Sequence, residues 1–303
     1  MRLVSLLPSA TEIIYALGLG DDLAGVTFEC DEPPAARADK AIVVGGLDTS
    51  GMTPGDIDRY VRSQLESGQD LYTLHARALA ELAPDLIVTQ DLCRVCAIPS
   101  GHVSDALDYL GCHADVLTLD PHTLEEVLDS ILLVGRRALV ADRAERVVAG
   151  LRDRLARVAA AVAGRRPPAV AVLEWVDPPF TAGHWVPDLV TAAGGRAVAG
   201  LAGSAGSAGS ASVQADWADI EAAAPDLVVV APCGYHLAGA IEQADYAVRA
   251  LPGVPGVPVW AIDADGIVVR PGPRLVNGVE ALASILHPEA VPAAPPGTVH
   301  RVR

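Results

Sequence analysis

Two short apolar segments, each preceded by the same tripeptide, most constrain how this chain can fold. Ala-Pro-Asp occurs at 83–85 and again at 224–226, followed by Leu-Ile-Val-Thr at 86–89 and by Leu-Val-Val-Val at 227–230. Continuous runs of Val, Ile and Leu are typical of strands that are buried on both faces of a parallel sheet. The repeat therefore predicts two related α/β halves. Ligands of such sheets bind beyond the C-terminal ends of the strands.

Composition supports this interpretation and narrows the possible partners. The chain has 303 residues, which is enough for two domains, and it is 51% hydrophobic but only 4% aromatic. A formal net charge of −16 argues against a nucleic-acid partner, because phosphate binding needs a basic face. No run approaches ~18 consecutive apolar residues, so we predict no membrane span.

The N-terminus passes directly into what we interpret as the first strand, at 3–7. We see no separate apolar region with a small-residue cleavage site, and the sequence therefore predicts a cytoplasmic protein. Ser9 and Glu12 fit a capping box at the start of the next helix. That helix N-terminus would suit an anionic group of a ligand.

Helical periodicity runs from 123 to 164, with one break near 139–141. We predict an N-terminal α/β lobe at 1–138, a linker helix at 139–166, a C-terminal α/β lobe at 167–288 and a disordered tail at 289–303. The predicted fold class is α/β, with two Rossmann-like lobes of parallel sheet joined by a long backbone helix. The ligand cleft is expected between the lobes.

Four of the five cysteines follow the C-terminal ends of predicted strands, namely Cys30, Cys93, Cys96 and Cys233. Cys112 instead precedes its strand, and we interpret it as structural. Cysteines in a reducing compartment are poor candidates for disulfides and better ones for metal or redox chemistry. If the two lobes face each other, the four converge. They then suit an iron–sulfur cluster or a tetrahedral zinc site.

The spacing favours a cluster over zinc, because zinc ribbons usually use two close C-x-x-C pairs. Two other interpretations remain open. Cys93 and Cys96 alone could form a redox pair, and all four could simply be small buried residues near loops.

Other side chains with binding chemistry follow predicted strands in the second half. His184 could ligate cobalt or iron, and Trp185 offers a flat apolar face for a macrocycle. Arg270 and Arg274 flank a rigid Pro-Gly-Pro turn. They could bind an anionic ligand group or pair with acids. The acids we expect in that role are Glu29 and Asp91.

Five motifs, in order along residues 1–288, carry a resemblance to a known family. They are Leu-Leu-Pro-Ser-Ala-Thr-Glu at 6–12, Asp-Glu-Pro-Pro-Ala at 31–35, Ala-Pro-Asp-Leu-Ile at 83–87, Asp-Pro-Pro-Phe-Thr-Ala-Gly at 177–183 and Arg-Pro-Gly-Pro-Arg at 270–274. The chain resembles the class III periplasmic-binding-protein superfamily, TroA-like, and within it the cobalamin-binding proteins of ABC importers. The resemblance implies two lobes, a long connecting helix and one ligand in the cleft.

Within that superfamily the chain looks closest to a cytoplasmic branch usually labelled cobalamin-binding. The branch typically carries Glu-Cys-Asp, here at 29–31, a C-x-x-C loop, here at 93–96, and Pro-Cys-Gly, here at 232–234. The importer proteins lack this cysteine set.

Two functional hypotheses follow. The first is a cytoplasmic protein that binds cobalamin, another corrinoid or a different metal-containing ligand between its lobes; the cobalamin part rests on the resemblance alone. The alternative is an iron–sulfur protein, which could act as a redox enzyme, with its cluster on Cys30, Cys93, Cys96 and Cys233. The sequence names no turnover reaction and no protein partner, and it contains no GxGxxG fingerprint.

Overall fold

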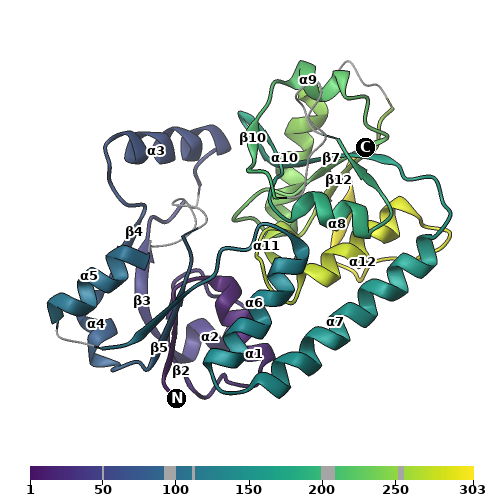
Figure 1. The fold of residues 1–303 in the computed structure, drawn as a ribbon. Coiled ribbons are helices and arrows are strands. Elements are labelled where there is room, and N and C mark those ends of the chain that lie inside the picture. The colour runs from purple at the N-terminus through teal and green to yellow at the C-terminus, as the bar shows by residue number, and fades with distance from the viewer. Residues whose placement is uncertain (50, 92–99, 111–112, 199–208, 252–255) are drawn as a thin grey trace. The chain divides into compact units, whose positions relative to one another are not determined.

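The computed structural model describes residues 1–49, 51–91, 100–110, 113–198, 209–251 and 256–303. Contacts divide the chain into two compact units. Unit 1 comprises Met1–Pro121 and Leu128–Ala149, and unit 2 comprises His122–Val127 and Gly150–Arg303. Figure 1 shows a sheet with its own covering helices in each unit. The predicted α/β fold with two lobes is confirmed.

Unit 1 is built on a sheet of six strands among the described residues, in the order β4-β3-β2-β1-β5-β6. All neighbours are parallel except β3 and β4. The strands are β1 Leu3–Ser5, β2 Leu23–Thr27, β3 Ala41–Gly46, β4 Tyr72–Leu74, β5 Leu86–Thr89 and β6 Asp115–Thr118.

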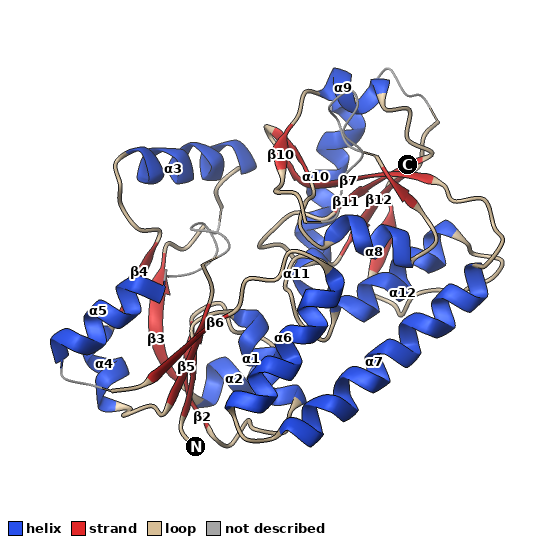
Figure 2. Cartoon of the chain, in the orientation of Figure 1, coloured by secondary structure: helices blue, strands red, loops and turns tan. Residues whose placement is uncertain are grey.

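Helices cover both faces of this sheet. The helices of unit 1 are α1 Pro8–Ala16, α2 Pro34–Asp39, α3 Pro54–Glu66, α4 Ala76–Glu81, α5 Ser100–Leu110, α6 Leu124–Arg137 and the first part of α7 Ala141–Val162. Helix α3 lies off both faces of the sheet (Figure 2). Helices α4 and α5 lie on one face, and α1, α2 and α6 on the other (Figure 2). On the first face, Leu79 and Val103 pack against Val4, Val43 and Ile87 of the strands, and all five are fully buried.

The first helix does not begin as predicted. Pro8 is its first residue and Leu7 its N-cap, with no side chain capping it. Proline suits this position, because its fixed φ fits a helix and its missing N–H is not needed there. Ser9 therefore lies inside the helix, and its buried hydroxyl has no partner in the described part of the chain. The predicted Ser9–Glu12 capping box is wrong.

Unit 2 contains seven strands among the described residues. Six follow the order β10-β8-β7-β11-β12-β13, and β9 pairs separately with β7. The central β7, β11 and β12 are parallel, whereas β8, β10 and β13 add antiparallel strands. The strands are β7 Ala169–Val176, β8 Pro179–Thr181, β9 Arg196–Ala197, β10 Val213–Gln214, β11 Leu227–Val230, β12 Val259–Ile262 and β13 Val299–Arg301.

The helices of unit 2 also lie on both faces of its sheet (Figure 2). They are α8 Val186–Ala192, α9 Trp217–Ala222, α10 Leu237–Ala250, α11 Ala264–Ile267 and α12 Leu275–Leu286. Helices α9 and α10 form one apolar core with the sheet, in which Ile220, Ala240 and Ala244 meet Leu173 and Val230. Helices α8 and α12 pack together on the other face.

The repeated Ala-Pro-Asp tripeptide has the same structure in both units. Ala83 and Ala224 adopt left-handed backbone angles, with φ of 44° and 46°. The amide of Asp85 donates to Arg2 O at 2.8 Å, and its carboxylate accepts from Arg2 N at 2.6 Å. Asp226 makes the same two bonds to Ala169, at 2.7 Å each. Each aspartate thus ties the central strand to the residue at the start of the neighbouring strand.

The helical stretch at 123–164 and the C-terminal tail differ in how well they were predicted. The predicted break near 139–141 is confirmed, since α6 ends at Arg137 and α7 begins at Ala141. The tail that we predicted to be disordered instead returns to the sheet as β13, which pairs with β12. Among the helices described, none is both long and apolar enough to cross a membrane.

Candidate functional site

The C-terminal ends of the parallel strands carry the candidate binding residues of each unit. In unit 1 the strand order reverses at β1, which lies between β2 and β5. Such a point is where open α/β sheets bind ligands. Residues 28–31 follow β2 and residues 90–91 follow β5 at this edge.

Cys30 lies at this edge but points into the protein. Its side chain is fully buried, and Sγ lies 3.1 Å from Thr11 Oγ1 and 3.3 Å from Thr27 Oγ1. These hydroxyls come from α1 and from the end of β2. In this conformation the Cys30 thiol is packed in the interior of unit 1, in contact with two hydroxyl groups.

The two acids predicted at this edge are both engaged in local structure. Glu29 accepts a hydrogen bond from Tyr72 Oη at 3.3 Å. The carboxylate of Asp91 accepts from Ser100 N at 2.7 Å and from Ser100 Oγ at 2.6 Å, which satisfies the start of α5. The amide of Asp91 donates to Asp120 Oδ1 at 2.7 Å.

In unit 2, the loops after β11 and β12 meet in a polar network. Nδ1 of His236 lies 2.9 Å from Asp263 Oδ1, and Gly234 N donates to Asp265 Oδ1 at 3.3 Å. Arg270 donates from Nη2 to Asp265 Oδ2 at 2.5 Å, and the two side chains are only 10% and 14% exposed. Such an ion pair, largely shielded from water, fixes the geometry of the edge.

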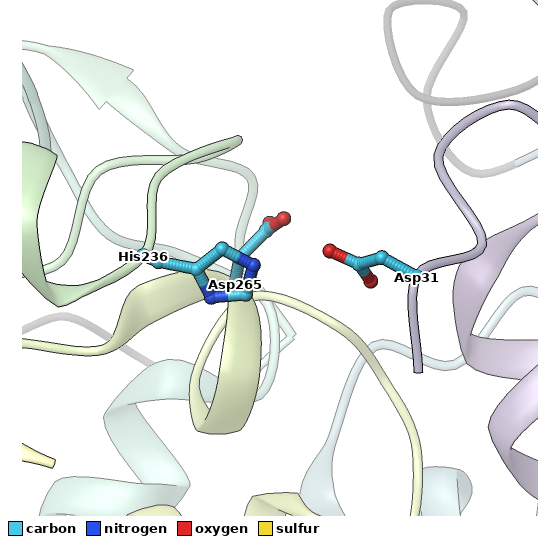
Figure 3. A group of neighbouring side chains, drawn as sticks. All are labelled: Asp31, His236 and Asp265. Atoms are coloured by element: carbon cyan, nitrogen blue, oxygen red, sulfur yellow. The ribbon is translucent and has the colours of Figure 1, made fainter. Parts of the chain in front are cut away.

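Figure 3 labels His236 and Asp265 of this network, together with Asp31 from the loop after β2 of unit 1. Within unit 2, a ring nitrogen of His236 and a carboxylate oxygen of Asp265 lie within 4.8 Å of each other. The carboxylate of Asp263 contacts Nδ1 of His236, so that the imidazole is held by a residue of the neighbouring loop. Sequence reasoning did not select the two aspartates, although Asp-Ala-Asp directly follows the buried strand β12.

An aromatic pair lies at the same edge of unit 2. The rings of Trp175, in β7, and Tyr235, after β11, have centroids 5.9 Å apart and are tilted by 53°. Trp175 Nε1 donates to Asp177 O at 3.1 Å. Burial raises the pKa of the Tyr235 phenol, and the charge of Glu242 adds to this effect. Tyr235 is therefore neutral at physiological pH.

Cys233 follows β11 and is exposed, with its amide donating to Glu174 O at 3.2 Å. Cys93 and Cys96 lie outside the described residues. Within the described part of the chain, no group of three or more potential metal-ligating side chains includes a cysteine. The predicted convergence of four cysteines is not shown, and the iron–sulfur hypothesis gains no support.

Trp185 is an interior residue of unit 2. It is 6% exposed, and its Nε1 donates to Val268 O at 2.8 Å. The indole is therefore part of the buried interior of unit 2. Arg274 is the N-cap residue of α12 and is half-buried. The roles predicted for both in ligand binding stay predictions.

His184 has an unusual backbone and an unusual environment. Its φ is +52°, and its Nδ1 is buried without a hydrogen-bond partner in the described residues. Burial lowers the pKa of the imidazole, and the neighbouring His122 lowers it further. The ring centroids of these two histidines are 5.7 Å apart. Sequence reasoning missed His122, which lies 62 positions earlier in the chain and carries no motif.

A comparison with known families identifies the chain. The sequence profile of the family described as periplasmic binding protein matches residues 3–258. The chain belongs to this family. The predicted resemblance to class III periplasmic binding proteins is thereby confirmed, whereas the narrower branch with a four-cysteine set is not shown.

Relatives match this periplasmic binding protein along nearly its whole length. An uncharacterized ABC transporter substrate-binding lipoprotein, YvrC of Bacillus subtilis, is 25% identical over 95% of this chain and 80% of its own. A vitamin B12-binding protein of Vibrio cholerae is 25% identical over 94% of this chain and 88% of its own.

Solved structures show the same fold. A periplasmic heme binding protein from Pseudomonas aeruginosa has a TM-score of 0.70 at 22% identity, covering 99% of this chain and 97% of that one. The periplasmic vitamin B12 binding protein BtuF of Vibrio cholerae has a TM-score of 0.62 at 21% identity, covering 94% and 96%.

These relatives overturn the prediction of a cytoplasmic protein. They are described as periplasmic proteins or as a lipoprotein. The prediction from the N-terminal residues was wrong, and the relatives point to a place outside the cytoplasm.

Proposed function

We propose that this protein is the substrate-binding component of an ABC importer and that its substrate is a metal-containing macrocycle of the cobalamin or heme class. The observation that carries the proposal is the match to a vitamin B12-binding protein over 94% of this chain and 88% of that protein. Family membership supports the transport role, and a membrane permease is the implied protein partner.

The aromatic pair of unit 2 supports this class of substrate. Trp175 and Tyr235 are half-buried and lie at the edge of the sheet where α/β proteins bind ligands. Flat aromatic faces suit the large apolar surface of a macrocycle. Arg270, held rigidly by Asp265, places a cation at the same edge, and it would complement the carboxylate or phosphate groups of such a substrate.

The test is a titration of the purified chain with cyanocobalamin and, separately, with hemin, followed by calorimetry and by the visible absorption of the ligand. We expect saturable one-to-one binding of one of the two. Cobalamin binding with no hemin binding would identify a corrinoid carrier, and the reverse would identify a heme carrier. Absence of binding to both would overturn the proposal.

A matched pair of variants locates the site. Trp175→Leu should weaken binding by about two- to tenfold, because a stacking contact with an aromatic side chain contributes on the order of 0.5–1.5 kcal/mol beyond the area that it buries. Trp217→Leu is the control: Trp217 forms a similar tilted pair with Tyr246, with ring centroids 6.4 Å apart, but it packs against the core beside α10. Equal losses from both variants would refute the placement of the substrate at the Trp175 edge.

A further inference from the structure

The histidines His122 and His184 stand apart from the polar edge described above. His184 follows β8, and His122 precedes α6 in the short segment that belongs to unit 2. Their rings are neighbours, with centroids 5.7 Å apart and planes inclined by 49°. We propose that these two imidazoles form a binding site for a divalent first-row transition-metal ion such as Zn²⁺ or Cu²⁺.

The separation of the rings fits two ligands of one ion. With Zn–N bonds of about 2.0–2.1 Å, an ion lies about 3.2 Å from each ring centre, so N–metal–N angles of about 110–125° place the ring centres about 5.2–5.7 Å apart. The observed 5.7 Å lies at the end of this interval. Imidazole nitrogen is a preferred ligand of zinc and copper.

The backbone around both histidines is fixed. His184 N donates to Ser210 O at 2.6 Å, and Gly209 N donates to His184 O at 3.1 Å, which holds His184 at its positive φ. A non-glycine residue in this region costs on the order of 1–3 kcal/mol, and such strain clusters at functional sites.

The segment of His122 is tied to the helix that follows His184. Leu124 N donates to Asp188 Oδ2 at 2.9 Å, and His122 N donates to Glu126 Oε2 at 2.6 Å. The bond between Leu124 and Asp188 therefore holds the backbone that carries His122 beside the helix that follows His184.

The unpartnered nitrogen is the second, independent observation. A buried polar atom without a hydrogen bond costs on the order of 1–3 kcal/mol. Nδ1 of His184 is such an atom among the described residues. Because His122 is exposed, an ion can reach its ring from solvent, and an ion shared with His184 would satisfy a nitrogen that has no partner among the described residues.

Among the described residues, no group of three or more histidines, cysteines and carboxylates with ligand atoms within 4.8 Å of one another includes this pair. Water would complete the coordination, so the site is an open one. It does not depend on the proposed transport function, because its ligand is the ion alone.

The experiment titrates the full chain, first stripped with a chelator, with Zn²⁺ by calorimetry and with Cu²⁺ by electron paramagnetic resonance. Reactive thiols are blocked beforehand, so that cysteines do not contribute. We expect one ion per chain, with nitrogen hyperfine structure from two imidazoles in the copper spectrum.

The variants are His122→Asn, His184→Asn and, as a control, His300→Asn at an exposed position in β13. Asparagine tolerates left-handed backbone angles, so His184→Asn keeps the fold, which its melting temperature verifies. Each of the first two should weaken binding about tenfold or more, in the range seen when support for a metal site is lost. The control should bind like the wild type. The proposal is overturned if the wild type binds no ion, or if all three variants bind as tightly as the wild type.

Discussion

Arg270 and Asp265 form an ion pair with an Nη2–Oδ2 distance of 2.5 Å at the edge of unit 2. Both side chains are largely shielded from water. Removing one partner of such a pair leaves a charge without compensation in a poorly hydrated place. This relationship gives the first prediction.

Arg270→Met should lower the free energy of unfolding by about 2–3 kcal/mol, somewhat below the roughly 3–5 kcal/mol found for fully buried pairs. Chemical denaturation monitored by circular dichroism measures the change. Arg270→Met combined with Asp265→Asn should recover part of the loss, because no lone charge remains.

The matched control for that prediction is Arg154→Met. Arg154 pairs with Glu280 at 2.6 Å, but the side chains are 29% and 40% exposed. Solvent screens such a pair, so the expected loss stays near or below about 1 kcal/mol. A larger loss from Arg154→Met than from Arg270→Met would contradict the argument from burial.

Gly183 should tolerate no side chain. A Cβ at this position would lie 2.4 Å from Ser212 N and 2.5 Å from Ser210 O, which are backbone atoms of a neighbouring segment. Gly183→Ala should therefore destabilise the chain by about 1–3 kcal/mol, as overpacking does. Thermal unfolding measures it.

Gly150→Ala is the opposite case and serves as the control. Gly150 lies in α7, is exposed, and has nothing within 4 Å of the position that a Cβ would take. Alanine should stabilise the helix by about 0.5–1 kcal/mol. If Gly183→Ala and Gly150→Ala changed the stability in the same direction, backbone crowding at Gly183 would not explain the effect of its substitution.

His184 should make the stability of the chain depend on pH. Burial, and then His122, lower its pKa in the folded state below the ordinary value of about 6.5. Between the folded and the unfolded pKa the unfolded chain binds more protons, so stability is complete above about pH 6.5 and falls as the pH drops below it.

The measurement is the unfolding free energy at pH 7.5 and pH 5.5, with chelator present. The wild type should lose more stability on acidification than His184→Asn does. Identical losses in the two proteins would assign the pH dependence to other groups.

The two described cysteines should differ in reactivity. Cys30 is fully buried beside two threonine hydroxyls, whereas Cys233 is exposed. Iodoacetamide should label Cys233 in the native protein within minutes and Cys30 only when the chain opens. Peptide mapping by mass spectrometry separates the sites, and both should react in denaturant. Rapid native labelling of Cys30 would show that its surroundings open readily.

The sequence was sufficient to predict the strands at the centre of each unit. The runs at 86–89 and 227–230 are buried strands, and the repeated tripeptide before them does mark equivalent positions. Apolar periodicity also predicted α6 and α7 with the break between them. These features depend on local pattern and burial, which a sequence records directly.

The orientations of side chains were harder to predict from the sequence. Trp185 satisfies its indole N–H with Val268 O, 83 positions later, and no local pattern reports that contact. Cys30 follows a strand end, as predicted, yet turns towards Thr11 and Thr27. Ser9 matched a capping motif, but the helix begins at Pro8, and its N-cap residue is Leu7.

The short segment His122–Val127 has a practical consequence for dividing this protein. It belongs to unit 2, although unit 1 contains the residues on both sides of it. A gene fragment that starts at residue 150 would lack Leu124, whose N–H binds Asp188. A fragment that ends at residue 149 would carry the segment without the unit to which it belongs. No single cut yields both units intact, so studies of one half alone require a rearranged gene in which the segment is grafted onto the second unit.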